Sequence, residues 1–169
     1  MFDNGSDFYF MDSPLGRIKM VACDNFLTEI EFVEDDASLF QNHEQTALTP
    51  LLEACRQQLE AYFSGSLKEF TLPLKPAGTD FQQEVWQALQ EIPYGKTISY
   101  LTLSKRLGNV KAIRAVGRAN GQNPLAIIIP CHRVIGSDGS LTGYAGGLWR
   151  KKRLLQHEGV LLQKELFPD

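Results

Sequence analysis

The sequence has few of the features that mark secreted or membrane-embedded proteins. Only three cysteines occur in 169 residues, and so sparse and odd a set argues against a disulfide framework. No window approaches about 18 uninterrupted apolar residues, and the first ten residues lack the basic-then-apolar pattern of a signal peptide. We therefore expect a soluble, cytoplasmic protein with reduced thiols and no membrane partner.

Acidic residues are missing from one long stretch of the chain. Between Ile92 and Ser137 there is no Asp or Glu, whereas seven Lys or Arg occur there. Residues 1–91 hold 16 acidic and 5 basic residues, and residues 92–169 hold 4 and 12, so the net charge of −3 is the sum of −11 and +8. A basic half of this kind favours binding to polyanions such as nucleic acid. The alternative is a basic surface that contacts only solvent.

The rest of the composition is that of a globular protein, with 43% hydrophobic and 22% charged residues. Polar and apolar residues alternate over 8–11, 17–23 and 27–33, with turn residues between them, which predicts an antiparallel meander. Apolar residues at helical spacing predict a helix from Pro50 to Phe63, with Cys55, like Cys23, serving packing. We predict an N-terminal domain over 1–78 that contains these elements, a loop or weak helix at 34–49 and a linker at 66–78.

The second predicted domain, residues 79–169, is mostly helical, which makes the chain an α+β protein. Thr79 and Gln82 have the form of a capping box, which opens a helix that reaches Ile92. Two short helices follow, over 100–107 and 110–120, and a last one spans 148–158. The two short helices have the form of a helix-turn-helix, and three basic residues share one face of the second: Lys111, Arg114 and Arg118.

Cys131 is the candidate nucleophile of the chain. Only the thiolate is a good nucleophile, and the base and cation that follow, His132 and Arg133, are groups that help a thiol to ionise. The apolar run 127–129 ends in Pro130, which favours an extended conformation before it, so we expect a strand that ends at the cysteine. In that geometry His132 acts on the thiol through a water. The alternative is an inert, buried cysteine.

The last predicted helix carries its charges against the helix macrodipole. Arg150, Lys151, Lys152 and Arg153 crowd its N-terminal half, and Glu158 lies in its final turn. We expect the basic residues to be solvated surface. Glu158 falls on or near the apolar face and needs a partner, for which His132 is the candidate.

These segments together resemble a known family. Residues 130–134 (PCHRV), 143–147 (GYAGG) and 157–159 (HEG), with 114–117 (RAVG) and 123–124 (NP), resemble the O6-alkylguanine-DNA alkyltransferases, in particular the stand-alone bacterial type. The likeness is specific from 81 to 159 and is one of layout only before that. It implies direct DNA repair: Cys131 takes the alkyl group from O6-alkylguanine in double-stranded DNA, once per molecule, with no cofactor and as a monomer.

The resemblance also implies roles for single residues. Glu158 would polarise His132, which would deprotonate Cys131 through a water; Asn123 would brace the turn, and Tyr100 would protonate or hydrogen-bond the departing guanine. Arg114 would replace the flipped base, with the second helix in the minor groove. The implied DNA contacts are Ser99, Tyr100, Lys111, Arg114, Ala115, Gly117 and Arg118. The implied pocket residues are Val134, Tyr144, Ala145 and Gly146.

The sequence departs from some members of this family at two points, and two other functions remain as alternatives. Some relatives have serine where Ala145 stands, which removes one hydroxyl contact to O6. Some bind zinc in the N-terminal domain, but Cys23, His43 and Cys55 lack close ligand spacing, so we expect no metal. A non-catalytic helix-turn-helix DNA-binding module and a thiol hydrolase with a Cys-His-Glu triad are the alternatives. Whether O4-alkylthymine is also repaired stays open.

Overall fold

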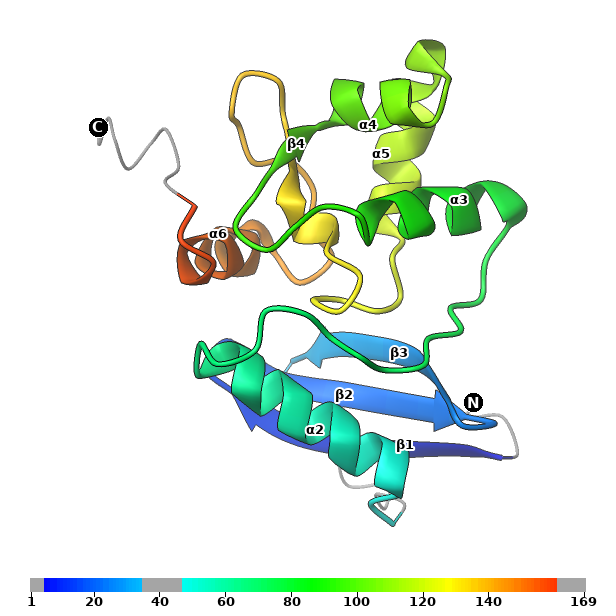
Figure 1. Cartoon of the computed structure of the whole chain (residues 1–169), viewed down its shortest axis with the longest axis vertical. Coiled ribbons are helices and arrows are strands. Elements are labelled where there is room, and N and C mark those ends of the chain that lie inside the picture. The colour runs from blue at the N-terminus through cyan, green and yellow to red at the C-terminus, as the bar shows by residue number, and fades with distance from the viewer. Residues whose placement is uncertain (1–4, 35–46, 161–169) are drawn as a thin grey trace. The chain divides into compact units, whose positions relative to one another are not determined.

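The chain forms two compact units. The computed structural model describes residues 5–34 and 47–160. One unit comprises Met1–Ala77 together with Pro124–Ile128, and the other comprises Gly78–Asn123 and Ile129–Asp169. For the described residues, Figure 1 shows a sheet with helix α2 (Pro50–Phe63) in the first unit and a group of helices in the second, which confirms the predicted α+β class.

The sheet of the first unit is the predicted meander. Strands β1 (Ser6–Ser13), β2 (Gly16–Cys23) and β3 (Phe26–Val33) pair antiparallel in that order. The turn between β2 and β3 has φ of 52° at Asp24 and 63° at Asn25. Two consecutive positive φ values are typical of the tight hairpin turn whose twist matches that of the strands, and Asp and Asn tolerate them.

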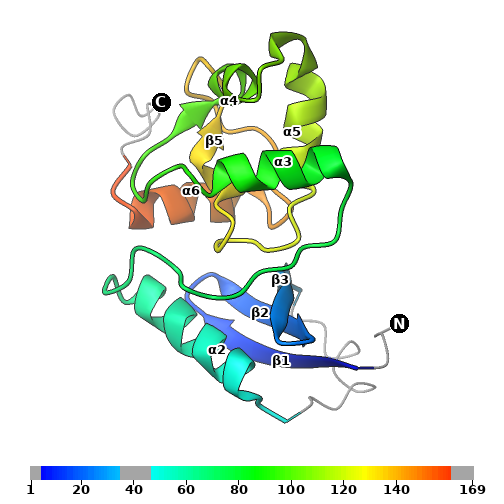
Figure 2. The ribbon, with the colours of Figure 1, turned by 45° about the vertical axis from the view of Figure 1, so that its right-hand side comes forward.

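Helix α2 (Pro50–Phe63) lies on one face of this sheet (Figures 1 and 2). The hydroxyl of Thr49 accepts the backbone N–H of Leu52 at 3.3 Å and caps the helix. Cys55 is fully buried on the face of α2 that packs, as predicted, and burial raises its pKa to about 12. Its thiol is therefore inert at neutral pH.

Two segments far along the chain pair with the edge strand β3. The backbone N–H of Leu27 donates to Pro73 O, and that of Ile30 donates to Pro124 O, both at 2.8 Å. Part of the predicted 66–78 linker is therefore held to the sheet, because an unpaired strand edge offers free backbone donors and acceptors. Residues 124–128, which were expected in the second domain, belong to the first unit in the same way.

Up to residue 160, the second unit contains four α-helices, two 3₁₀ turns and a short parallel strand pair. The helices are α3 (Asp80–Leu89), α4 (Tyr100–Arg106), α5 (Ile113–Gly121) and α6 (Leu148–His157), and strand β4 (Ile98–Ser99) pairs with β5 (Val134–Ile135). The capping box of Thr79 and Gln82 forms as predicted. The predicted helix over 110–120 begins instead with a 3₁₀ turn, η1 (Val110–Ala112), and becomes α-helical at Ile113.

Two features are absent from the described residues. No helix in 5–34 or 47–160 is long and apolar enough to cross a bilayer. In those same ranges no three His, Cys, Asp or Glu side chains come together in a way that could hold a metal ion. His43 and most of the predicted loop at 34–49 lie outside the described residues.

Candidate active site

The backbone before Cys131 is tightly bent, so the prediction of a strand that ends at the cysteine is wrong. Ile128 N–H donates to Ala126 O and Cys131 N–H donates to Ile129 O, each at 2.8 Å. These are γ-turns, centred on Ile127 with φ of 70° and on Pro130 with φ of −81° and ψ of 63°. A short apolar run does not distinguish a strand from buried irregular backbone.

Cys131 begins a single 3₁₀ turn, η2 (Cys131–Arg133), and is only 5% exposed. Burial raises the pKa of its thiol, while the side chain of Asn123 and the charge of Lys151 act in the opposite direction. The thiol is therefore protonated at neutral pH, and a nearby base has to take its proton before it can react.

His132 and Glu158 form a buried pair. His132 Nε2 lies 2.6 Å from Glu158 Oε2, and both side chains are inaccessible to solvent. Burial lowers the pKa of His132 although the carboxylate counteracts this, so the imidazole is neutral. A carboxylate only accepts, so Nε2 carries the proton, and Nδ1 keeps a free lone pair. Nδ1 has no hydrogen-bond partner among the residues that the structure describes.

Glu158 has a second buried partner, Arg133. Arg133 Nε donates to Oε1 at 2.8 Å, and one terminal nitrogen donates to Oε2 at 3.2 Å. The backbone N–H of Gly95 adds a third donor at 3.1 Å. Burial alone would raise the pKa of Glu158, but the hydrogen bonds and charges of His132 and Arg133 hold it well below its usual range. The carboxylate is ionised, and the contact predicted between Glu158 and His132 is confirmed.

Two asparagines hold the turn around the cysteine. Asn123 Nδ2 donates to Ile129 O at 2.7 Å, and Asn120 Nδ2 donates to Cys131 O at 3.4 Å. Asn123 lies where a brace was expected. Asn120 was missed, and the only signal for it was an amide among the buried positions of a predicted helix.

A basic helix end contacts the glycine-rich loop after β5. Lys151 Nζ donates to Thr142 O at 3.0 Å, and Arg150 donates to Gly146 O at 2.9 Å. Tyr100 OH donates to the same Thr142 O at 2.8 Å. The expectation that all four residues of 150–153 are solvated is therefore wrong for Arg150 and Lys151, which are buried. Helical side chains lean toward the N-terminus of their helix, and this brings both onto the loop.

The four predicted pocket residues differ in exposure. Val134 is fully buried and opens β5, where it pairs with Ile98. Tyr144 is half-buried, and its hydroxyl has no hydrogen-bond partner within the described part of the chain. Burial raises the pKa of Tyr144 far above its ordinary value, so the phenol stays protonated. Ala145 is exposed and Gly146 partly so, and they present backbone groups of the loop.

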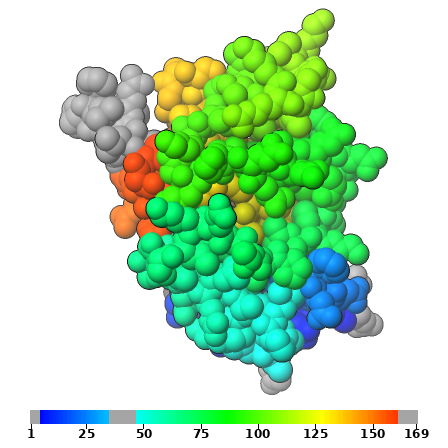
Figure 3. All heavy atoms as spheres, in the orientation of Figure 1, coloured from blue at the N-terminus to red at the C-terminus, as the bar shows by residue number. Residues whose placement is uncertain are grey.

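The predicted basic residues lie on exposed parts of η1 and α5. Lys111, Arg114 and Arg118 are exposed, as is Ala115, and the turn between α4 and α5 forms an exposed edge of this unit (Figure 3). Gly117 instead faces the ring of Tyr100, since a Cβ atom there would lie 3.8 Å from that ring. Ser99 caps α4 by accepting the N–H of Thr102 at 3.0 Å. The two helices of the helix-turn-helix therefore carry the basic face on α5 and Tyr100 at the start of α4, and the two helices meet where Gly117 lies against the Tyr100 ring.

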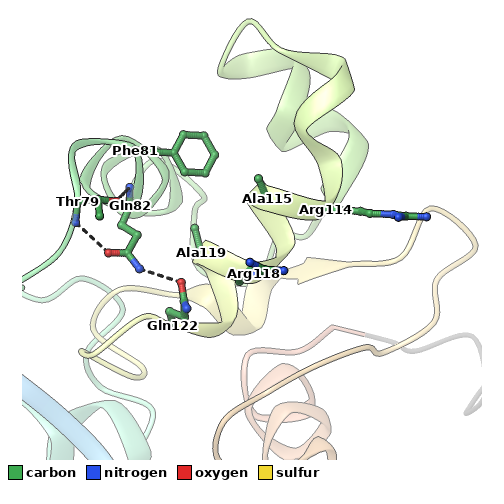
Figure 4. A pocket seen from close by; sticks show the side chains of 8 residues that line it. All are labelled: Thr79, Phe81, Gln82, Arg114, Ala115, Arg118, Ala119 and Gln122. Carbon is green, nitrogen blue, oxygen red and sulfur yellow. Dashed lines mark hydrogen bonds between the residues drawn. The ribbon is translucent and has the colours of Figure 1, made fainter.

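A shallow groove of about 430 Å³ runs between α3 and α5. Figure 4 shows Phe81 on α3 opposite α5, and the side chain of Arg114 pointing away from Phe81. Gln82 Nε2 on α3 donates to Oε1 of Gln122, the C-cap residue of α5, at 2.8 Å. Two residues of the basic face, Arg114 and Arg118, belong to the lining of this groove. The full lining is Thr79, Phe81, Gln82, Arg114, Ala115, Arg118, Ala119 and Gln122.

Both units match family models. Residues 80–160 match the model described as 6-O-methylguanine DNA methyltransferase, DNA binding domain. Residues 8–76 match the model described as 6-O-methylguanine DNA methyltransferase, ribonuclease-like domain.

Individual relatives are similar over most of their length. A protein of Methanosarcina acetivorans named methylated-DNA–protein-cysteine methyltransferase is 45% identical over 152 residues, which cover 90% of this chain and 97% of the relative. A Mycobacterium tuberculosis protein of the same name is 47% identical over 148 residues, with 88% and 89% covered.

Solved structures give the same result. The M. tuberculosis O6-methylguanine methyltransferase has a TM-score of 0.81 and 44% identity, and covers 90% of this chain and 92% of its own. The M. tuberculosis OGT in complex with DNA has a TM-score of 0.80 and 45% identity over the same shares.

Proposed function

Because the chain belongs to the 6-O-methylguanine DNA methyltransferase family, we propose that it repairs DNA by transferring an alkyl group from O6 of guanine to Sγ of Cys131. The observation that carries this proposal is the buried pair of His132 and Glu158 directly beside the only cysteine of the second unit. An ionised carboxylate next to a neutral imidazole is the arrangement that turns histidine into a base for a nucleophile.

The proton and electron movements follow from these contacts. Glu158 holds the proton of His132 on Nε2, so Nδ1 takes the thiol proton of Cys131 through a water. The thiolate forms a bond to the alkyl carbon while the bond from that carbon to O6 breaks. The bonding electrons return to guanine, which regains a proton with help from the phenol of Tyr100. A thioether remains, so each molecule acts once.

The basic face supplies the binding of DNA. Lys111, Arg114 and Arg118 are exposed on consecutive turns and can neutralise phosphates. Ala115 is also exposed, and its small side chain allows DNA to approach the helix backbone closely. Cys131 is buried, and the O6 of a stacked guanine could not reach it, so the damaged nucleotide has to leave the helix. We propose that α5 enters the minor groove and that Arg114 occupies the space of the flipped base. Tyr100 and Ser99, at the start of α4, would contact the adjoining backbone.

A mass measurement tests the transfer. Incubation with a duplex that contains O6-methylguanine should add about 14 Da to the peptide that carries Cys131, since a methyl group replaces a proton. The Cys131→Ser variant should bind the duplex and gain no mass. An unmodified peptide after complete binding would favour a DNA-binding module without chemistry. More than one equivalent of repaired guanine per protein would favour a hydrolase, because a stable thioether does not turn over.

The same assay addresses the finer parts of the proposal. Duplexes with larger O6-alkyl groups or with O4-methylthymine compete for the same thiol, so their rates of adduct formation define the substrate range. We propose that the protein acts as a monomer in the cytoplasm, and light scattering of the free protein and of its DNA complex tests the first part. A dimer at the concentrations of the assay would contradict it.

A further inference from the structure

Among residues 5–34 and 47–160, the most deeply buried lysine lies beside the proposed site. Lys151 is in the first turn of α6 and has an exposed fraction of 0%, whereas the next residue, Lys152, is exposed. Lysine side chains are almost never fully buried unless their charge is paired. The position of Lys151 therefore requires a reason.

The ammonium group has three hydrogen-bond acceptors around it. Thr142 O lies 3.0 Å from Nζ, and Gly143 O and Tyr100 OH each lie 3.4 Å from it. All three protons of the ammonium can thus be donated. The acceptors belong to the glycine-rich loop and to α4, so one side chain ties both to α6.

No anion balances this charge in the resting site. Among residues 5–34 and 47–160, no carboxylate lies within ion-pair distance of Lys151, and the buried Glu158 is paired with His132 and Arg133. Moving an ammonium out of water costs several kcal/mol unless an anion compensates it. The group that becomes an anion during the proposed reaction is Cys131, whose charge interacts with Lys151.

We propose that Lys151 is a positioning residue for alkyl transfer, whose ammonium holds Tyr100 and the Thr142–Gly143 backbone in place and stabilises the thiolate of Cys131. The role rests on the proposed function. It also accounts for a basic residue at the unfavourable end of α6, which the macrodipole alone would disfavour.

The surrounding ionisable groups are consistent with this role. Tyr100 contacts Lys151 from α4, the charge of Lys151 acts on Cys131 and His132 of η2, and Arg150 on α6 turns to Gly146 O instead. Burial lowers the pKa of Lys151 to about 8, with the charge of Cys131 acting against this. At pH 7 the ammonium is therefore still charged, and an extra positive charge next to the thiol favours its ionised form.

Three substitutions separate the charge from the hydrogen bonds. Lys151→Gln keeps hydrogen-bond donors without charge, Lys151→Arg keeps both, and Lys151→Met keeps neither. We expect the pKa of the Cys131 thiol to rise by about one unit or more in the Gln and Met variants, which is read from the pH dependence of its alkylation by iodoacetamide. In the presence of the O6-methylguanine duplex, the rate constant of transfer at pH 7 should fall about tenfold for the Gln variant, while the affinity for DNA changes less than twofold. The Arg variant should recover most of the rate.

The matched control is Lys152→Gln, which makes the same change at the next, exposed residue and should leave the rate and the thiol pKa unchanged. A Gln variant with wild-type thiol pKa and rate would overturn the role of the charge. Equal losses in the Gln and Arg variants would assign Lys151 to packing alone and would overturn it as well. Thermal melting of each variant identifies loss of folding.

The unmodified protein offers a test that does not depend on any variant folding. With ¹³C-labelled lysine, one side chain should titrate near pH 8, and its titration should move when Cys131 is alkylated. A lysine titration that does not move when Cys131 is alkylated would contradict the proposal. These thiol and lysine titrations use no DNA, so they stand or fall separately from the mass test of alkyl transfer.

Discussion

Glu158 is shared between a base, His132, and a cation, Arg133. Oε2 accepts from His132, Arg133 donates to both oxygens with its shorter bond to Oε1, and both partners are buried with Glu158. Because Arg133 neutralises the carboxylate, Glu158 orients His132 without drawing its proton away. The need of Glu158 for a partner could be predicted from its helix position, but Arg133 could not, because adjacent residues give no indication of which side chain turns inward.

Replacing Glu158 tests this arrangement. Glu158→Gln removes the charge that fixes the tautomer of His132, so we expect the rate of transfer to fall about 100-fold or more. Affinity for the DNA duplex should hold, since the basic face is untouched. The variant also leaves Arg133 buried without an anion, which we expect to cost about 3–5 kcal/mol of folding free energy.

Both quantities are measurable in one preparation. Single-turnover mass spectrometry gives the rate, and denaturant unfolding gives the stability. Glu91→Gln, at an exposed position of the same unit, is the control for loss of one negative charge. A Glu158→Gln variant that transfers at the normal rate would remove Glu158 from the mechanism.

The lowered pKa of His132 predicts the pH dependence of transfer. His132 accepts a proton only when neutral, and its pKa lies below the ordinary value of 6.5. The rate should therefore hold as pH falls through 6.5 and decline only at lower pH. Below 6.5 the unfolded chain binds a proton at His132 that the folded protein does not, so stability also decreases in that range. Glu158, with a lowered pKa, adds a loss below about pH 4.5. A rate that halves at pH 6.5 or above would contradict this assignment.

Helix ends explain which elements were predictable. Thr49, Thr79 and Ser99 each accept a backbone N–H of the first turn, and all three helices start where these caps predict. The cysteine segment was not predictable, because its conformation depends on γ-turns that leave no periodic pattern. The burial of the Lys151 side chain was also not predictable. It depends on hydrogen bonds to the carbonyls of Thr142 and Gly143, which lie in a loop without regular secondary structure.

The exposed face of α5 makes its own prediction. Arg114→Ala and Arg118→Ala each remove a positive charge from that face, so each should weaken binding of DNA. The slope of log affinity against log salt should become shallower by about 0.9 for each phosphate that is no longer neutralised. Arg114→Ala should in addition slow transfer at saturating duplex, because Arg114 is proposed to hold the flipped state. Fluorescence anisotropy over a range of salt concentrations measures the first effect.

A charge control completes this series. Arg17→Ala removes the same charge from the first unit, where Arg17 pairs with exposed Asp12, and should leave the salt slope unchanged. Equal slopes for Arg114→Ala and the wild-type protein would exclude a phosphate contact by Arg114.

At the scale of the whole molecule, all the proposed reactive groups belong to one unit. Cys131, His132, Glu158, Tyr100 and Lys151 lie in the second unit, and the chain reaches Cys131 after Pro124–Ile128, which belong to the first. The charge split between the two halves could be read from the sequence. The pairing of residues 124–128 with β3 could not be predicted from the sequence, because it depends on which edge strand of the sheet is left unpaired.

A buried nucleophile that keeps its alkyl group changes the protein that carries it. Cys131 is 5% exposed, so a methyl group on its sulfur has to fit into a packed site, which we expect to cost about 1–3 kcal/mol. For a chain of this size each kcal/mol lowers the melting temperature by roughly 2–4 °C, so the alkylated protein should melt several degrees below the unreacted one. Scanning calorimetry before and after reaction with the O6-methylguanine duplex, with the DNA removed, measures this shift. Cys131→Ser carried through the same steps should show no change, and an alkylated protein as stable as the free one would mean that the site has room for its product.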